Sequence, residues 1–331
     1  MVCNLEFSVL VVTLFSAQII GLDAKIINVE VDLSPGLHIF SIVGLADKEV
    51  QESRERIGAA IRNIGARPPH KKSERVIVNL APADIKKEGP AFDLPIALGF
   101  LLASEQTRFN PKGKLFVGEL GLDGAIKPVS GVLPIAILGR LAGFNCLYVP
   151  SGNGAEAALI DGIEIKEAPN IQGLLDDLEG KRELEIAKPE IQPQDHAGEE
   201  TVDFSLIRGQ EQAKRALEIA AAGGHNILMH GPPGTGKTIL ARAMTSILPA
   251  MTPEETIEVT KIYSIAGALK HGASIVKKRP FRAPHHTASS AAITGGGSTI
   301  RPGEVTLAHR GVLFLDELPE FQNNVLEALR Q

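Results

Sequence analysis

The chain has 331 residues, of which 44% are hydrophobic and 22% are charged, and its formal net charge is −5. This length and balance fit a soluble protein of two domains, and the negative net charge excludes a global basic field for binding nucleic acid. Its two cysteines, Cys3 and Cys146, exclude a disulfide scaffold, do not favour a zinc site and indicate a cytoplasmic location. The apolar run from Leu5 to Ile20 has no preceding positive residue and is interrupted by polar ones. We expect a buried first strand there, or a start codon slightly upstream, and no signal peptide or membrane span.

The first 178 residues alternate strand-like and helix-like patterns. Residues 26–33 alternate as a half-buried strand, Asp47 can cap a helix that stops at Gly65, and residues 93–103 form an apolar helical run. The other expected elements are strands at 37–43, 75–80 and 146–149, a hairpin of 115–119 with 125–127, and a buried helix at 131–142. The sequence therefore predicts a mixed α/β domain over residues 1–178.

Residues 179–205 have a different composition. They contain Pro189, Pro193 and the pair Glu199-Glu200, with little periodicity. Such a segment is typical of a linker. A second domain is expected over residues 206–331, and its first predicted helix covers residues 210–222.

The octapeptide Gly231-Pro232-Pro233-Gly234-Thr235-Gly236-Lys237-Thr238 fits the pattern G-x-x-x-x-G-K-[ST]. An apolar run at 226–230, which we expect to be a buried strand, precedes it, and a helix-forming run at 238–244 follows it. Glycines let the backbone N–H groups of such a loop point at one anion, and the helix start adds its positive dipole end. The pattern predicts an ATP site in which Lys237 reaches the β- and γ-phosphates and Thr238 places its hydroxyl on Mg²⁺.

A second apolar run, Gly311 to Leu315, ends in Asp316 and Glu317. Nucleoside triphosphatases need a carboxylate that holds the metal and a group that positions water. We assign the first role to Asp316 and the second to Glu317, with Lys237 as the other catalytic residue. A solvated strand end is the alternative interpretation of Asp316-Glu317 taken alone.

Two further patterns bear on ligands. His285-His286 has no cysteine nearby, and adjacent side chains point in different directions, so we expect loop packing or backbone hydrogen bonding and not metal ligation. Basic residues form two local clusters that can neutralise phosphates, although each is also compatible with a solvated turn. The clusters are Arg62, Arg67, His70, Lys71, Lys72 and Arg75, and Lys277, Lys278, Arg279 and Arg282.

Together with the octapeptide, several blocks of the chain resemble one family. They are residues 31–36, 53–56, 79–84, 262–267, 280–289, 295–297, 302–305 and 307–321. The chain is similar to the ComM/YifB family of magnesium-chelatase-like AAA+ ATPases. This resemblance implies an N-terminal ribosomal-S5-like α/β domain, similar to the proteolytic domain of Lon, followed by a partial P-loop AAA+ α/β domain.

Lon-type proteases use a serine nucleophile and a lysine base. Residues 87–93 resemble the serine motif, but Ala91 stands at the serine position, and Leu133 stands at the position of the lysine. The resemblance therefore implies a domain for binding or assembly and not a peptidase.

Members of this family are thought to form hexameric rings, and those of the ComM type resemble DNA motors for branch migration in recombination and natural transformation. The resemblance thus implies DNA as a partner and a homo-hexamer as the complete form. Two alternatives stay open, namely the ATPase subunit of a magnesium chelatase and a non-motor module whose assembly depends on ATP.

The sequence stops at Gln331 inside a helical run. AAA+ modules continue through a sensor strand, an arginine finger and a helical lid. We therefore expect a truncated chain that hydrolyses ATP poorly by itself, in which Leu326 and Leu329 lack a partner layer.

Overall fold

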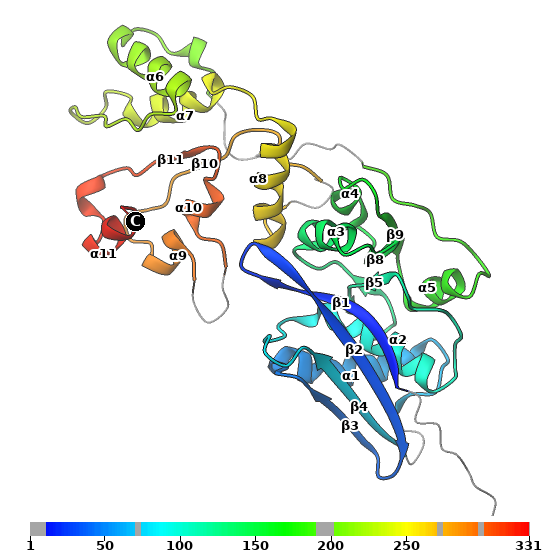
Figure 1. Cartoon of the computed structure of the whole chain (residues 1–331). Coiled ribbons are helices and arrows are strands. Elements are labelled where there is room, and N and C mark those ends of the chain that lie inside the picture. The colour runs from blue at the N-terminus through cyan, green and yellow to red at the C-terminus, as the bar shows by residue number, and fades with distance from the viewer. Residues whose placement is uncertain (1–10, 70–73, 190–201, 270–273, 297–300, 331) are drawn as a thin grey trace, which may run out of the picture. The chain divides into compact units, whose positions relative to one another are not determined.

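The computed structural model describes residues 11–69, 74–189, 202–269, 274–296 and 301–330. The chain divides into two compact units, residues 1–190 and residues 191–331. Both units combine helices with strands, and both contain parallel strand pairs (Figure 1). The predicted mixed α/β fold is confirmed.

The first unit contains a four-stranded sheet in the order β1-β2-β4-β3. Its strands are β1 (Val12–Ile20), β2 (Asp23–Pro35), β3 (Ile39–Val43) and β4 (Glu74–Ala81). The pairs β1–β2 and β2–β4 are antiparallel, whereas β3 and β4 are parallel. Every second residue of β2 from Ile27 to Val31 is buried, as the alternating sequence predicts. Cys3 and the start of the apolar N-terminal run lie outside the described residues.

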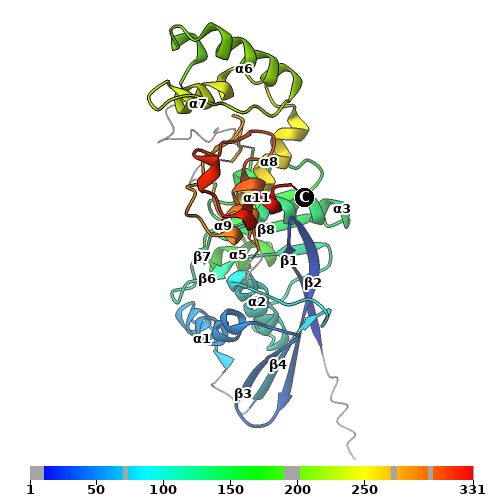
Figure 2. The same cartoon turned by 90° about the vertical axis from the view of Figure 1, so that its left-hand side faces the viewer.

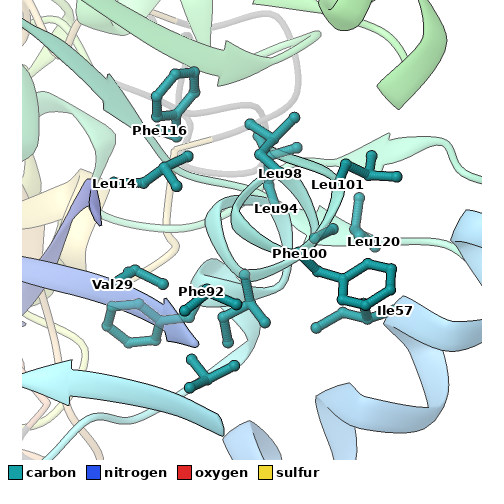
Figure 3. Packing of buried hydrophobic residues seen from close by; sticks show 14 of the residues in the cluster. Leu14, Val29, Ile57, Phe92, Leu94, Leu98, Phe100, Leu101, Phe116 and Leu120 are labelled. Carbon is teal, nitrogen blue, oxygen red and sulfur yellow. The ribbon is translucent and has the colours of Figure 1, made fainter. Parts of the chain in front are cut away.

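Helices α1 (Lys48–Asn63) and α2 (Asp93–Ala103) pack on this sheet (Figure 1). Asp47 caps α1 as predicted, because its carboxylate accepts the N–H of Val50 at 2.8 Å. α2 is apolar around most of its circumference and lies within the core. Figure 3 shows its Leu94, Leu98 and Phe100 among residues of the strands and of α1.

A smaller parallel sheet follows, in the order β5-β8-β9. It consists of β5 (Lys114–Phe116), β8 (Cys146–Pro150) and β9 (Glu164–Ala168), and its helical neighbours are α3 (Val132–Leu141), α4 (Gly154–Ala157) and α5 (Ile171–Leu178). The predicted hairpin forms only through β6 (Glu119–Leu120) and β7 (Ile126–Lys127). The expected single strand at 115–119 was wrong, because Leu115 and Phe116 pair with β8, whereas residues 117–118 belong to no strand.

Asp177 of α5 joins these elements through a buried polar network. Its carboxylate accepts hydrogen bonds from Tyr148 Oη (2.8 Å), Lys166 Nζ (2.8 Å) and the backbone N–H of Leu184 (2.7 Å). Burial alone would raise the pKa of Asp177, but these donors outweigh it and hold that pKa below its ordinary value. The segment after α5 is thereby attached to the first unit, and the N–H of Ala187 donates to Ile165 of β9 at 2.8 Å. The predicted domain limits at 178 and 205 remain predictions.

The second unit has short strands and mostly short helices. The longer helices are α6 (Glu211–Gly223), α7 (Lys237–Ile247) and α8 (Pro253–Ile265), and the shorter ones are α9 (Ser290–Thr294), α10 (Glu304–Leu307) and α11 (Asn323–Ala328). α6 and α7 lie side by side in both views (Figures 1 and 2). α8 begins with a capping box in which Thr252 and Glu255 satisfy each other's backbone N–H.

The strands β10 (Phe281–Arg282) and β11 (Val312–Leu313) pair in parallel. The expected buried strand at 226–230 was wrong, since these residues are mostly exposed and form no strand; Leu228 is 81% exposed. A buried parallel strand needs hydrogen-bonding neighbours and covered faces. No segment of the described chain provides such a neighbour for residues 226–230.

The helix at the end of the chain also differs from the expectation. Leu326 and Leu329 pack against a buried cluster of Ile293, Phe321 and Val325. The expectation that they lack a partner layer was therefore wrong, because α9 and Phe321 provide one.

Candidate functional site

The glycine loop turns sharply into α7. Gly234 and Gly236 have φ values of +79° and +84°, which are strained for any residue with a Cβ, and Gly236 directly precedes the first helical residue, Lys237. Thr235 closes the turn, as its hydroxyl donates to the carbonyl of Pro232 at 2.9 Å. The loop geometry thus depends on Gly236, which the sequence pattern requires, and on Gly234, which occupies a position that the pattern leaves free.

Lys237 extends back over its own loop. Its ammonium group donates to the carbonyls of Gly231 and Pro232, each at 2.9 Å. The side chain is half-buried, and its charge is thereby held at the mouth of the loop. A lysine in this position can contribute positive charge to an anion that the loop holds.

Two parts of the predicted site lie next to each other although 78 positions separate them. Thr238 Oγ1 donates to Asp316 Oδ2 at 3.2 Å, and both residues are exposed. A hydroxyl and a carboxylate are hard oxygen donors, which Mg²⁺ prefers. The donor set therefore fits a magnesium ion beside a phosphate group.

The β10–β11 ladder brings Asp316 to this place. Val312 N–H donates to Pro280 at 2.8 Å and Phe314 N–H donates to Arg282 at 2.8 Å. Gly311 permits the start of the ladder, since a Cβ at this position would lie 2.0 Å from the carbonyl oxygen of Pro280. The ring of Phe281 stacks on that of Phe314 at a centroid distance of 6.0 Å.

Glu317 follows Asp316 in a left-handed backbone conformation, with φ +54°. Its N–H donates to Asp316 Oδ1 at 3.1 Å, and its Oε2 lies 3.6 Å from His286 Nδ1. The sequence did not reveal this second contact, because His285-His286 was interpreted as loop packing. The parallel pairing of β10 with β11 is the signal that could have revealed it, because His286 and Glu317 have the same separation in sequence as the paired residues of these strands.

The second basic cluster is largely used for internal contacts. Arg279 donates to the carbonyls of Pro249 and Arg310, each at 2.6 Å, and to Glu255 at 3.1 Å, and its side chain is only 15% exposed. Arg282 forms a bidentate pair with Glu304 at 2.5 and 2.7 Å. The expectation that all four residues could face a phosphate backbone was therefore wrong for these two arginines. Lys277 is exposed.

In the first basic cluster, Arg62 and Arg75 are exposed and Arg67 is half-buried, whereas His70, Lys71 and Lys72 lie outside the described residues.

The structure also describes the two positions at which Lon-type proteases have their serine and lysine. Ala91 is half-buried before α2 and its carbonyl accepts the N–H of Gly118, and Leu133 is fully buried in α3. Neither side chain can supply a nucleophile or a base.

The described residues hold no group of three or more histidine, cysteine, aspartate or glutamate side chains arranged for a metal ion. In the same part of the chain, no helix combines the length and apolarity needed to cross a bilayer.

Comparison with known families places both units in one class. Residues 203–331 match the family described as magnesium chelatase, subunit ChlI, and residues 29–153 match the family described as subunit ChlI of Mg-chelatase. The chain is also 28% identical over 144 residues, or 38% of its length, to a magnesium-chelatase 38 kDa subunit of Cereibacter sphaeroides, covering 42% of that protein. Fold and matches define a magnesium-chelatase-like protein of the AAA+ type.

More extensive similarity identifies the family. The chain is 44% identical over 320 residues to the competence protein ComM of Haemophilus influenzae, which covers 96% of this chain and 62% of the relative. It is 46% identical over 319 residues to the protein YifB of Salmonella typhimurium, covering 94% of this chain and 60% of the relative. The chain belongs to the ComM/YifB family, and it spans about three fifths of the length of these relatives.

Proposed function

We propose that the second unit binds ATP with Mg²⁺ at the glycine loop, and that it belongs to an ATP hydrolase. The contact between Thr238 and Asp316 carries this proposal, because it unites the end of the loop with the acidic end of β11 across 78 positions. Membership of a magnesium-chelatase-like family supports it. The proposed loop residues are Gly231, Pro232, Pro233, Gly234, Thr235, Gly236, Lys237 and Thr238.

Each residue has a chemical role in this proposal. The backbone N–H groups of the loop and the start of α7 face the phosphates, and Lys237 adds a positive charge. Thr238 and Asp316 hold the metal through oxygen atoms, and Glu317 positions the attacking water. The metal ion neutralises charge on the phosphates when it is bound.

Nucleotide binding can be tested on this chain with a fluorescent ATP analogue in the presence of Mg²⁺. Lys237→Ala should abolish binding, since the loop then loses its charged side chain. Lys112→Ala, at an exposed lysine of the first unit, is the matched control and should bind as the parent does. Equal affinity of Lys237→Ala and the parent would contradict the assignment.

For the whole protein, we propose a cytoplasmic homo-hexameric motor that acts on DNA in branch migration, recombination or natural transformation. The ComM relative is named a competence protein, which supports a role in natural transformation. Exposed basic residues such as Arg62, Arg75 and Lys277 supply local positive charge. DNA-stimulated ATP turnover by the full-length form would distinguish a motor from a non-motor assembly module, which should show no stimulation.

A magnesium-chelatase ATPase subunit is the alternative function, and the match to the 38 kDa subunit favours it. That match covers 38% of this chain, whereas the ComM and YifB matches cover about 95%. We therefore prefer the DNA motor. Stimulation of ATP turnover by porphyrin-loaded chelatase partners, without stimulation by DNA, would reverse this preference.

We also propose that the first unit does not cleave peptides. Activated-serine chemistry needs a nucleophilic oxygen, which Ala91 lacks, and Leu133 cannot act as its base. A serine-directed activity probe should fail to label the purified protein. Casein cleavage that persists through rigorous purification would contradict this proposal.

A further inference from the structure

The first unit contains a chemically labile pair of residues, Asn153 and Gly154, at the start of α4. It is the one Asn-Gly pair in the sequence. An asparagine that precedes glycine is especially prone to deamidation in a flexible chain, because glycine has no side chain to shield its backbone nitrogen. We propose that Asn153 is a site of spontaneous deamidation, and that the carboxylate of Glu167 guards it in the folded chain. This site does not depend on the ATP site proposed above.

The chemistry of deamidation shows which groups have to be free. The backbone nitrogen of Gly154 loses its proton and attacks the side-chain amide carbon of Asn153. A bond forms between these two atoms, the bond from that carbon to Nδ2 breaks, and the amide nitrogen leaves as ammonia. Water then opens the cyclic imide to give aspartate or isoaspartate. The reaction therefore needs an available N–H at Gly154 and an Asn153 amide that can rotate toward it.

Glu167 of β9 occupies the first of these groups. Its Oε1 accepts the N–H of Gly154 at 2.8 Å and that of Gly152 at 2.9 Å. This contact opposes loss of the Gly154 proton, because the resulting negative nitrogen would face a negative oxygen. Asn153 stands at the N-cap of α4 without a capping hydrogen bond from its own side chain, so Glu167 replaces it as the cap.

The Asn153 amide is held as well. Its Oδ1 accepts the N–H of Val129 at 3.0 Å, and its Nδ2 donates to the carbonyl of Val129 at 2.9 Å and to Glu156 Oε1 at 2.8 Å. The residue is 6% exposed, and its ψ of −9° keeps the Gly154 nitrogen away from the side-chain carbon. The folded state is thus closed to the reaction, which requires local opening of α4.

The fold itself requires both members of the labile pair. A Cβ at position 154 would lie 2.4 Å from Glu167 Cγ, so the close approach of Glu167 depends on glycine. An amide at position 153 both accepts from and donates to the backbone of Val129, which a carboxylate or a hydrocarbon side chain cannot do. The chain therefore keeps a reactive dipeptide for structural reasons and protects it with Glu167.

Conversion of Asn153 to an aspartate removes its donors. The product can accept the N–H of Val129, but it cannot donate to the carbonyl of Val129 or to Glu156. It also places a second negative charge beside Glu156, which is only 6% exposed. The segment that leads into α3 thereby loses part of its attachment to α4, which packs against both α3 and β9 (Figure 1). Because the reaction is one-way, the modified fraction records how often α4 opens.

The experiment follows deamidation of the whole chain by peptide mass spectrometry during incubation at mildly alkaline pH. The folded parent should deamidate at Asn153 at least about 10-fold more slowly than the same chain in urea, because only the open fraction reacts. Glu167→Ala should deamidate about 5-fold faster than the parent, since it lacks the hydrogen bond to Gly154. Glu167→Gln, whose amide oxygen can still accept this N–H, should stay within about twofold of the parent.

The same strand offers a matched control. Glu164 of β9 is exposed and contacts Lys166 at 3.5 Å, away from the labile pair. Glu164→Ala should deamidate as the parent does. Circular dichroism of each variant before incubation separates a loss of fold from a loss of the guard.

A second measurement tests the consequence of the modification. In Asn153→Asp, amide hydrogens at the start of α3 should exchange about 10-fold faster than in the parent, whereas those of α2 should not change. Adding Glu156→Gln should restore part of the protection, because its amide can donate to the new carboxylate. If Asn153→Asp does not fold, parent protein deamidated by incubation replaces it in this measurement.

Four results would overturn the proposal. Absence of deamidation at Asn153 in urea would remove the site itself, and equal rates in the folded parent and in urea would show that the fold does not protect it. Equal rates in the parent and in a folded Glu167→Ala variant would remove the role of Glu167. Unchanged exchange at the start of α3 after conversion of Asn153 would remove the structural consequence.

Discussion

Among the described residues, the first unit buries its apolar side chains in two large clusters, whereas the second unit divides them among three small ones. In the second unit, the arginines Arg279 and Arg310 each contact several backbone or acidic groups. Arg279 connects three segments, and Arg310 lies 3.4 Å from Glu255 and 3.0 Å from Glu258 of α8. Apolar burial therefore defines the first unit, and directional polar contacts align the short elements around the candidate site.

A core substitution in the first unit should have the largest effect. Leu98→Ala removes a fully buried side chain of α2 and should lower the free energy of unfolding by about 2–5 kcal/mol, because a cavity remains. Leu122→Ala, at a residue that is 60% exposed, is the control and should be nearly neutral. Chemical denaturation followed by circular dichroism measures both. Leu217→Ala, in a smaller cluster of the second unit, should lower the free energy of unfolding less than Leu98→Ala does. A larger decrease for Leu217→Ala would contradict the contrast drawn between the two units.

Arg279→Ala should have the next largest effect. It leaves the carbonyls of Pro249 and Arg310 and the carboxylate of Glu255 without this donor, for a loss of about 1–3 kcal/mol. Arg279→Lys should not restore stability, because an ammonium group cannot reproduce the planar fork. Lys277→Ala is the exposed control in the same run of residues. Equal stability of Arg279→Ala and Lys277→Ala in urea titrations would show that the arginine does not brace this unit.

The polar network of the first unit should give a smaller, pH-dependent effect. The folded-state pKa of Asp177 is lowered, so its contribution to stability is present above the ordinary aspartate pKa of about 3.9 and is lost as pH falls through the folded value. Asp177→Asn should therefore flatten the decline of stability with acid below about pH 4. Unfolding curves of the variant and the parent between neutral and acidic pH test this. An unchanged acid decline would assign it to other carboxylates.

The smallest effect is expected for a lysine that does not brace the fold. Lys277→Ala should weaken DNA binding by the chain modestly and reduce the slope of log affinity against log salt by about 1. Fluorescence anisotropy at several salt concentrations measures the slope, with Lys112→Ala as the control. An unchanged slope would remove Lys277 from the proposed contact surface.

Local signals in the sequence were sufficient for much of the first unit. Asp47 and Gly65 mark the limits of α1, and the apolar run from Asp93 to Ala103 coincides with α2. The split of residues 115–119 between two sheets was not predictable, because pairing with β8 depends on residues 32 positions away. A local sequence pattern indicates which helix or strand a segment favours, but a strand forms only where another segment is available to pair with it.

At the candidate site, too, local patterns were predicted from the sequence and contacts between distant residues were not. The octapeptide and Asp316-Glu317 were identified from short patterns and stay predicted site residues, and the structure adds the contact between Thr238 and Asp316. The apolar run at 226–230 has strand-like composition but no pairing partner among the described residues. His285-His286 packs in its loop as expected, but the contact of His286 with Glu317 and the internal contacts of Arg279 were not foreseen, because Glu317 and Glu255 are distant in sequence. Such contacts depend on the tertiary structure, which local sequence patterns do not reveal.

The β10–β11 ladder also has a consequence for the order of folding. It joins segments 31 positions apart through only two paired residues on each side. Closing such a loop costs entropy before the short ladder returns any stabilisation. The alignment of Thr238, Asp316, Glu317 and His286 should therefore form late in folding and open early in local unfolding. Amide hydrogens of Val312 and Phe314 should exchange faster than those of Val29 and Val31, so loss of the site would precede loss of the first unit.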